Sequence, residues 1–350
     1  MPVRSYQQPG LNLAENGDDA TPLQVHELQI DLRQLGYLAR GLDGSFGSKT
    51  TSGVMALQHD LLNNHGSSTG GDGQAPVSVA DYNQGRVMDV TGIVDQNLAR
   101  CISDMLDDPQ FPSLPRAANA VEENGKIVPL LMGIANPAAP VPFLLGVLSQ
   151  ESDLKHYNEP RPGDSDTFIV LGLDKNATEK FIVTSRGYGA GQFTLFHHPP
   201  RPEEVATYLT DVRKNVSAAI GELREKFDKF IIGPSSGLQA DDRLAEIGSG
   251  PLRLCKFATT DPRYFRDCQQ CLKDAGAVNI QAGITPLYPG STSKYQPTQY
   301  YATASYPNVP NRARVGCDWP YAIRRYNGSG INSFHYQIRV IRKIQKLALS

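Results

Sequence analysis

Hydrophobic residues in the first third of the chain recur at helical spacing. The first apolar face consists of Val25, Leu28, Leu32 and Leu35. Gly36 follows this run and suits the left-handed position that ends many helices. A second helix is predicted to begin at Thr50 or Thr51. Its inner face consists of Val54, Leu57 and Leu61. With a third helix in VTGIVDQNLARCISDML, residues 21–106 are predicted to form a three-helix domain.

The pattern changes beyond residue 120. An apolar helix is predicted from about Val141, with Glu151 near its end. TFIVLGL and KFIVTS are β-branched runs on either side of residues 174–176, which indicates a β-hairpin, and SRGYGAGQFTLF is predicted to be a glycine-rich turn. Residues 201–231 keep one helical period throughout, on inner positions Leu209, Val212, Val216, Ile220, Leu223 and Phe227. The last helix has Tyr336, Val340, Ile344 and Leu347 on one face. The predicted fold class is α+β, mainly α.

These elements suggest a modular chain. DDPQFPSLPRAAN is rich in proline and is predicted to be a semi-rigid linker. A polar stretch containing cysteine and tyrosine interrupts the second half. The predicted segments are an N-terminal tail (1–20), the three-helix domain (21–106), the linker (107–119) and a helical domain (120–350) with an insertion at 232–316.

Composition narrows the class of protein. The 350 residues are 40% hydrophobic and 20% charged, with a formal net charge of −2. Such a balance disfavours a nucleic-acid binder with a basic face. No run approaches the roughly 20 apolar residues that span a bilayer. The first twenty residues have no apolar core of a signal peptide, so we expect either no export or export by another route.

Short motifs of the three-helix domain occur in a characteristic order. They are Leu28-Gln29, Leu35-Gly36-Tyr37, Asp43-Gly44, Phe46-Gly47, Leu57-Gln58 and Val90-Thr91-Gly92. This order resembles the three-helix peptidoglycan-binding domain of cell-wall hydrolases. The resemblance implies wall contacts by Tyr37, Asp43 and Phe46. The alternative is a generic three-helix bundle whose glycines only shape turns.

Four further motifs follow in order in residues 120–350. They are Glu151-Ser152, Gly189-Ala190-Gly191-Gln192, the pair Asp211 and Asn215, and Tyr326-Asn327-Gly328. Together they resemble the catalytic domain of lytic transglycosylases, which are lysozyme-like wall enzymes. The resemblance implies Glu151 as the general acid and base. It implies substrate-binding or supporting roles for Ser152, Gly189, Gly191, Gln192, Tyr326 and Asn327. In particular, Tyr326 would hydrogen-bond Glu151, and Ser152 is either a supporting donor or simply a helix-end residue.

A glutamate at the end of an apolar helix suits this chemistry. An ordinary glutamate is ionised at neutral pH, whereas desolvation favours the protonated form that can donate to a leaving group. The transglycosylase reaction forms a 1,6-anhydro ring and needs no second carboxylate. A muramidase would need a group to direct water, and Glu159, Asp164 and Asp166 are the candidates. A chitinase-like enzyme and a non-catalytic wall-binding or virion structural protein are further alternatives.

The remaining expectations concern cysteines and partners. Cys255, Cys268, Cys271 and Cys317 could form two disulfides, bind zinc or stay reduced, while Cys101 is expected to be a buried apolar residue. No cofactor and no metal is expected, and His197-His198 is a poor joint metal ligand. The expected partner is peptidoglycan. Action in the periplasm or wall would follow release by lysis with a holin, or a specialised secretion apparatus with an immunity protein in the producer.

Overall fold

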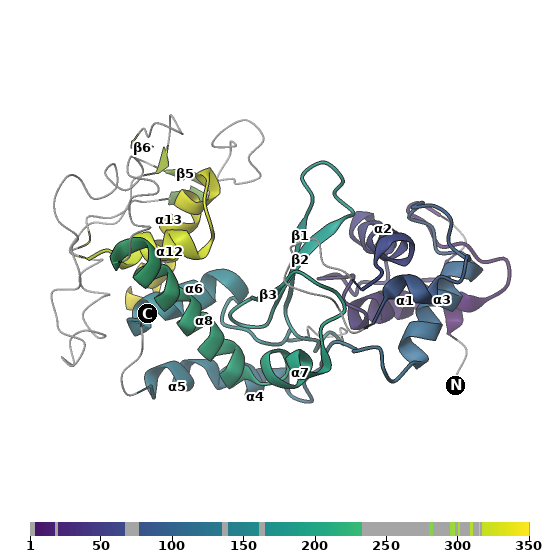
Figure 1. The fold of residues 1–350 in the computed structure, drawn as a ribbon, viewed down its shortest axis with the longest axis horizontal. Coiled ribbons are helices and arrows are strands. Elements are labelled where there is room, and N and C mark those ends of the chain that lie inside the picture. The colour runs from purple at the N-terminus through teal and green to yellow at the C-terminus, as the bar shows by residue number, and fades with distance from the viewer. Residues whose placement is uncertain are drawn as a thin grey trace. The chain divides into compact units, whose positions relative to one another are not determined.

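Helices dominate the chain, and a small antiparallel sheet lies in its middle third (Figure 1). The computed structural model describes residues 4–17, 20–66, 77–134, 139–160, 165–232, 280–282, 295–297, 300–301, 309–310, 315 and 317–349. The predicted α+β, mainly α class is confirmed. The chain divides into two compact units, which are residues 1–126 with 155–215 and residues 127–154 with 216–350. The predicted segment boundaries stay a prediction. The two compact units combine separate stretches of the chain, so their limits are not those of the predicted segments.

The first unit contains the three N-terminal helices and the sheet. Its α-helices are α1 (Pro22–Gln34), α2 (Ser48–Asn63), α3 (Gln96–Asp107), α4 (Ala120–Gly125) and α7 (Pro202–Glu204). Its strands are β1 (Leu171–Lys175), β2 (Val183–Tyr188) and β3 (Phe193–Leu195). Short 3-10 turns at Ser5–Gln7 and Val79–Tyr82 and a π-helical turn at Val205–Leu209 complete it.

The second unit is built mainly from helices. They are α5 (Ile127–Met132), α6 (Val141–Ser152), most of α8 (Val212–Phe227), α12 (Trp319–Tyr326) and α13 (Ile331–Leu349). A π-helical turn, Asp228–Ile232, follows α8. Two short antiparallel strand pairs are also present. β4 (Ile280–Ala282) pairs with β5 (Tyr295–Pro297), and β6 (Tyr300–Tyr301) pairs with β7 (Val309–Pro310).

The predicted apolar faces of the first helices form one core. Val25, Leu28, Leu32, Leu35, Val54, Leu57 and Leu61 are all buried. Gly36 ends α1 with a φ of 83°, and the Tyr37 amide returns to the Leu32 carbonyl at 2.8 Å. α2 begins at Ser48, slightly before the predicted start.

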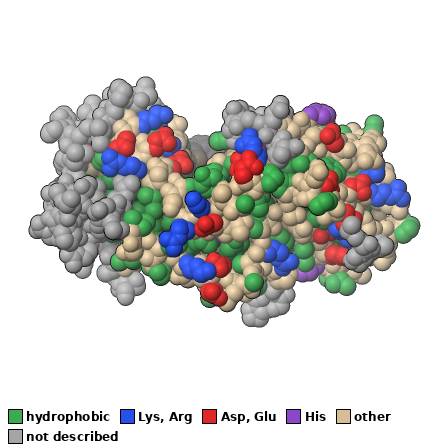
Figure 2. Space-filling model, turned by 60° about the horizontal axis from the view of Figure 1, so that its bottom comes forward, with side chains coloured by type: hydrophobic (Ala, Val, Ile, Leu, Met, Phe, Trp, Pro, Cys, Tyr) green, Lys and Arg blue, Asp and Glu red, His purple; other side chains and the backbone are tan. Residues whose placement is uncertain are grey.

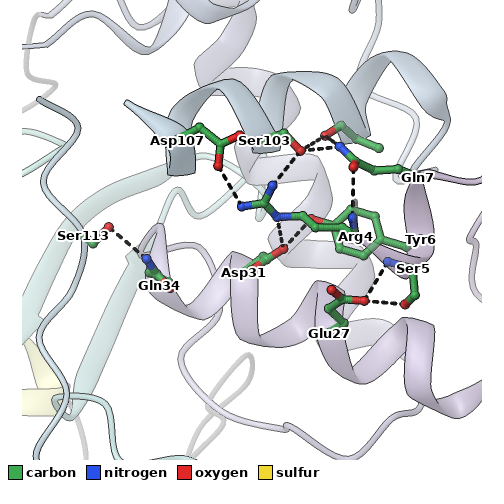
Figure 3. Close-up of polar contacts among 11 residues, drawn as sticks. Arg4, Ser5, Tyr6, Gln7, Glu27, Asp31, Gln34, Ser103, Asp107 and Ser113 are labelled. Atoms are coloured by element: carbon green, nitrogen blue, oxygen red, sulfur yellow. Dashed lines mark hydrogen bonds and ion pairs between the residues drawn. The ribbon is translucent and has the colours of Figure 1, made fainter. Parts of the chain in front are cut away.

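The N-terminal segment packs on this core (Figure 3). The Arg4 guanidinium lies between α1 and α3, with Nε 2.9 Å from Asp31 Oδ2 and a second nitrogen 3.0 Å from Ser103 Oγ. The buried Tyr6 hydroxyl donates to the same Asp31 oxygen at 2.5 Å. Leu13 is buried and pairs with Val94. Residues 4–13 therefore belong structurally to the three-helix domain.

The sheet is joined to the three helices by buried cations. Arg33 on α1 is fully buried and donates to the Leu38 and Ile169 carbonyls, both at 3.0 Å. Its Nε lies 3.4 Å from the carboxylate of Asp166. Arg186 on β2 donates to the Gly36 carbonyl at 3.2 Å. Because a buried charge is costly without partners, these contacts hold the sheet to the helices.

Two elements differ from their predictions. The segment predicted as a glycine-rich turn contains β3, which pairs Phe193 with Tyr188 and extends the hairpin to three strands. The helix predicted over 201–231 is interrupted at residues 210–211. There the Asp211 carboxylate accepts from the amides of Arg213 at 2.8 Å and Lys214 at 3.2 Å, which begins a new helix.

Several predictions lie partly outside the described residues. Cys255, Cys268 and Cys271 are among them, so the disulfide and zinc alternatives stay open. Cys317 and Cys101 are both buried, as expected for Cys101. In the part of the chain that the structure describes, no helix is long and apolar enough to cross a membrane. In the face shown by Figure 2, basic side chains are interspersed with acidic ones.

Candidate functional site

Glu151 occupies the last turn of an apolar helix. α6 begins with Pro142 in its first turn and buries Phe143, Leu144, Val147 and Leu148. The helix ends because Asp153 adopts a left-handed conformation, with a φ of 60°. The Leu154 amide then returns to the Leu148 carbonyl at 3.3 Å. This ending leaves Glu151 half-buried at the edge of the apolar surface.

A tyrosine from the last helix contacts the Glu151 carboxylate. The Tyr336 hydroxyl on α13 donates to Glu151 Oε1 at 2.5 Å. Tyr336 is only 4% exposed. Burial, and then the neighbouring Glu151 carboxylate, raise the pKa of Tyr336 well above its usual value. The phenol therefore stays protonated and remains a donor over the whole physiological pH range. The sequence motifs did not single out Tyr336.

Tyr326 and Asn327 lie at the end of α12. The Tyr326 ring stacks on that of Tyr336, with centroids 6.5 Å apart and planes at 14°. Burial, followed by the Glu151 carboxylate, raises the pKa of Tyr326 as well. Asn327 is exposed and ends the helix. The predicted hydrogen bond from Tyr326 to Glu151 stays a prediction, whereas the described one comes from Tyr336.

Ser152 and Lys343 complete the surroundings of the α6 terminus. The Ser152 hydroxyl donates to the Leu148 carbonyl at 3.1 Å, which is the helix-end arrangement. The Lys343 ammonium on α13 donates to the Ser149 carbonyl and lies 3.3 Å from Asp153 Oδ1. A cation near the last carbonyls of a helix also favours the helix dipole.

The turn of residues 189–192 belongs to the first unit. Gly189 has a φ of 71°, and a Cβ there would lie 2.5 Å from the His156 ring and 2.9 Å from Asn215 Nδ2. Only glycine fits this position. The Gly191 amide donates to Asn215 Oδ1 at 2.8 Å, and the Asn215 amide donates to the Tyr188 carbonyl at 2.8 Å. Asn215 therefore fixes the turn from the first residues of α8.

The Gln192 side chain folds back on its own turn. Its φ is 51°, and its amide nitrogen donates to the Gly189 carbonyl at 2.9 Å. Its Oε1 lies over the sheet, where a Cβ at Gly172 would approach it to 2.3 Å and one at Gly187 to 2.7 Å. The two glycines of β1 and β2 thus make room for the Gln192 carboxamide.

His156 is a structural residue that the motifs missed. Its Nε2 lies 2.8 Å from the Leu209 carbonyl, and its Nδ1 accepts from the Ala190 amide at 3.3 Å. These partners assign the neutral tautomer with the proton on Nε2. Burial lowers the pKa of His156 to about 4. No recognisable motif surrounds His156, because its partners are two backbone groups far away in the sequence.

The predicted site residues fall in both units. Glu151, Ser152, Tyr326 and Asn327 belong to the second unit, while Gly189, Gly191 and Gln192 belong to the first. The structure brings Glu151 and Tyr326 together around Tyr336, and it groups the glycine turn around Asn215. A single site combining the two groups stays a prediction.

Two of the three carboxylates considered for a hydrolase, Glu159 and Asp166, have partners within the fold. Glu159 lies 2.8 Å from Lys155 Nζ and accepts from Asn124 at 2.8 Å. Asp166 is buried beside Arg33. Asp164 lies outside the described residues. Among the described residues, no group of three histidine, cysteine or acidic side chains is placed to hold a metal ion.

The three residues predicted to contact the wall lie in different environments. Tyr37 is 1% exposed, and its hydroxyl donates to Asp60 at 2.9 Å. This location favours a role in the core. Asp43 is exposed and accepts from Gln29 Nε2 at 3.0 Å, and Phe46 is half-buried at the same turn. Asp43 and Phe46 therefore remain at the surface.

Comparison with known families bears on this part of the chain. Residues 21–61 match the family described as "Putative peptidoglycan binding domain". The chain contains a peptidoglycan-binding domain. The match covers α1, the turn of residues 43–47 and most of α2, including Asp43 and Phe46. The match supports peptidoglycan as a partner of this chain. No curated protein and no solved structure matched the chain in the other two comparisons.

The peptidoglycan-binding domain owes its turn geometry to a buried amide. Gln29 on α1 is fully buried, and its Nε2 donates to Asp43 Oδ1, the Ser45 carbonyl and Thr50 Oγ1 at 2.9–3.1 Å. Its Oε1 accepts from the Gly44 amide at 2.9 Å. Gln58 similarly holds the turn of residues 91–93 through the Thr91 and Gly92 amides. The two Leu-Gln motifs thus order the domain's two turns.

Proposed function

We propose that this chain is a peptidoglycan-cleaving enzyme, a lytic transglycosylase acting on the bond between N-acetylmuramic acid and N-acetylglucosamine. Glu151 is the general acid and base. The observation that carries the proposal is the Glu151 carboxyl group, half-buried at the end of apolar α6 and hydrogen-bonded by buried Tyr336. The peptidoglycan-binding domain supports the substrate class.

The chemistry follows from one carboxyl group. Protonated Glu151 donates its proton to the glycosidic oxygen O4 of the N-acetylglucosamine, and the C1–O4 bond breaks with its electron pair on that oxygen. Carboxylate Glu151 then removes the proton of the 6-hydroxyl of N-acetylmuramic acid as O6 bonds to C1. The products are a free 4-hydroxyl and a 1,6-anhydro ring, and Glu151 is protonated again. General acid and base catalysis of this kind typically increases the reaction rate by about 10²–10⁴-fold.

The alternative is a muramidase that delivers water to the same bond. A muramidase would use a second carboxylate. Two of its candidates, Glu159 and Asp166, are engaged by Lys155 and Arg33 respectively, and the Lys155 contact lowers the pKa of Glu159. These contacts favour structural roles for Glu159 and Asp166 and support the reaction that needs only Glu151.

The other motif residues have supporting roles in this proposal. Gln192 would bind the acetamido group of the substrate, and Gly189 and Gly191 would let the backbone approach the sugar. Gln192 now donates to the Gly189 carbonyl, so substrate would have to compete with that contact. Tyr326 would bind substrate or support Glu151 through its stack on Tyr336.

The test is mass spectrometry of the soluble products from purified sacculi. Glu151→Gln is run beside Glu179→Gln, which removes an exposed carboxylate in the turn between β1 and β2. We expect products one water lighter than hydrolytic muropeptides and resistant to borohydride, lost in Glu151→Gln and kept in Glu179→Gln. Reducible ends would establish the muramidase instead. Wall binding without soluble products would leave a non-catalytic wall-binding protein.

The proposed place of action is the periplasm or cell wall. The proposed routes are release by lysis with a holin and export by a specialised secretion apparatus, the latter with an immunity protein in the producer. Expression of the chain with and without an export signal distinguishes the sites of action. We expect lysis of the host only when the chain is exported.

A further inference from the structure

α13 approaches the end of α6 closely. A Cβ at Gly146 would lie 2.5 Å from Ile344 Cγ1, so only glycine allows the two helices to pack at this distance. Lys343 adds a polar link to the Ser149 carbonyl and the Asp153 carboxylate. The position of α13 relative to the last turn of α6 is therefore set by both apolar and polar contacts.

Tyr336 uses this packing to reach Glu151. It lies on the same helix as Lys343 and Ile344, two turns earlier, and its side chain is almost fully buried. The stack with Tyr326 holds the ring from one side. The hydroxyl then has one described partner, Glu151 Oε1 at 2.5 Å.

We propose that Tyr336 is the positioning residue of Glu151: its hydroxyl holds Oε1 and thereby fixes the orientation of the carboxyl group that exchanges a proton with the substrate. This inference rests on the proposed function, in which Glu151 is the acid and base. The sequence motifs predict this role for Tyr326. The geometry gives a direct contact to Tyr336 as well, and it stacks the Tyr326 ring on that of Tyr336.

The hydrogen bond has two consequences for Glu151. It restricts a side chain with three rotatable bonds to orientations that leave Oε1 beside Tyr336. It also stabilises the carboxylate more than the carboxylic acid, because the phenol donates to a charge. Removal of the phenol hydroxyl is therefore expected to raise the pKa of Glu151.

The direct test is the titration of Glu151 in the full chain. Carboxyl ¹³C NMR of glutamate-labelled protein gives the pKa, and Glu151→Gln identifies the resonance. Tyr336→Phe removes only the hydroxyl, and we expect the pKa of Glu151 to rise by about 1 unit. In the sacculus assay the alkaline limb of the rate profile should move upward by the same amount. We expect kcat to fall about tenfold with KM unchanged.

Tyr82→Phe is the matched control. Tyr82, which belongs to the first unit, also donates to a carboxylate, Asp108 at 2.7 Å. We expect Tyr82→Phe to leave the Glu151 titration and the rate profile as they are. An unchanged Glu151 pKa in Tyr336→Phe overturns the inference. A shifted pKa in a protein that releases nothing from sacculi upholds the Tyr336 contact and refutes the proposed function, so the two failures are distinguishable.

Discussion

Protonation of His156 should destabilise the first unit as the pH falls from 6.5 towards 4. The ring is buried, donates from Nε2 to the Leu209 carbonyl and accepts at Nδ1 from the Ala190 amide. A second proton has no place on Nδ1 without breaking the Ala190 contact. Burial accordingly lowers the pKa from 6.5 to about 4. The unfolded chain therefore takes up this proton first as the pH falls.

The magnitude follows from the two pKa values. Stability from this group is fully present above pH 6.5 and is lost as the pH falls towards 4. Each unit of difference corresponds to 1.36 kcal/mol, so the loss between pH 7 and pH 4 is about 3 kcal/mol. His198, whose pKa burial lowers well below its usual value, acts in the same direction. The His156 contribution must therefore be isolated by substitution.

The experiment compares wild type with His156→Gln, whose amide can still donate to the Leu209 carbonyl but does not titrate. Urea unfolding of the first unit is measured by pulse proteolysis, with cleavage within residues 155–215 as the readout. The measurement is repeated at several pH values from 7 to 4. Trp319, the only tryptophan in the chain, reports the second unit by fluorescence. We expect the wild type to lose about 3 kcal/mol more than His156→Gln over this range. Parallel pH profiles would refute the reasoning.

Two further substitutions test the packing of each unit. Gly146→Ala places a methyl group 2.5 Å from Ile344 and should destabilise the second unit by about 1–3 kcal/mol, measured by urea unfolding with Trp319 fluorescence; Ile344→Ala should relieve part of this cost, and simple additivity would contradict it. Arg33→Met leaves the buried Asp166 carboxylate without its cation and should cost about 3–5 kcal/mol in the first unit. Arg116→Met is the control, because this exposed arginine lies over the same Phe168 ring and should cost less than about 1 kcal/mol.

Local patterns predicted the elements well. The apolar periodicity located α1, α6 and α13, and the β-branched runs located the β1–β2 hairpin. The break before α8 was missed because residues 201–231 keep their apolar period across it, while the decisive event is the Asp211 carboxylate accepting from two amides. Apolar periodicity shows which face of a helix is buried. It does not show where a side chain, such as that of Asp211, caps backbone amides and starts a new helix.

Contacts between residues that lie far apart in the sequence were harder to predict from the sequence. The motifs predict roles for Glu151 and Tyr326, but sequence order alone cannot show that α13 brings Tyr336 to the Glu151 carboxylate. Asn215 was found as part of a motif, yet its role in holding the Gly191 amide required the fold. Arg33 and Arg186 look like ordinary surface cations in the sequence, and only their buried positions reveal their structural role.

The buried arginines between the first helices and the sheet affect how this protein could be rearranged. A wall-recognition segment on a free linker can be excised, transplanted or lost with little harm to its neighbour. Here, cutting the chain after residue 106 would strip Arg33 of the Ile169 carbonyl and Asp166, and Arg186 of the Gly36 carbonyl. In both fragments, polar groups that are buried in the intact chain would lose their hydrogen-bond and ion-pair partners. The three N-terminal helices therefore cannot be exchanged alone, and recombination could transfer them only together with residues 155–215.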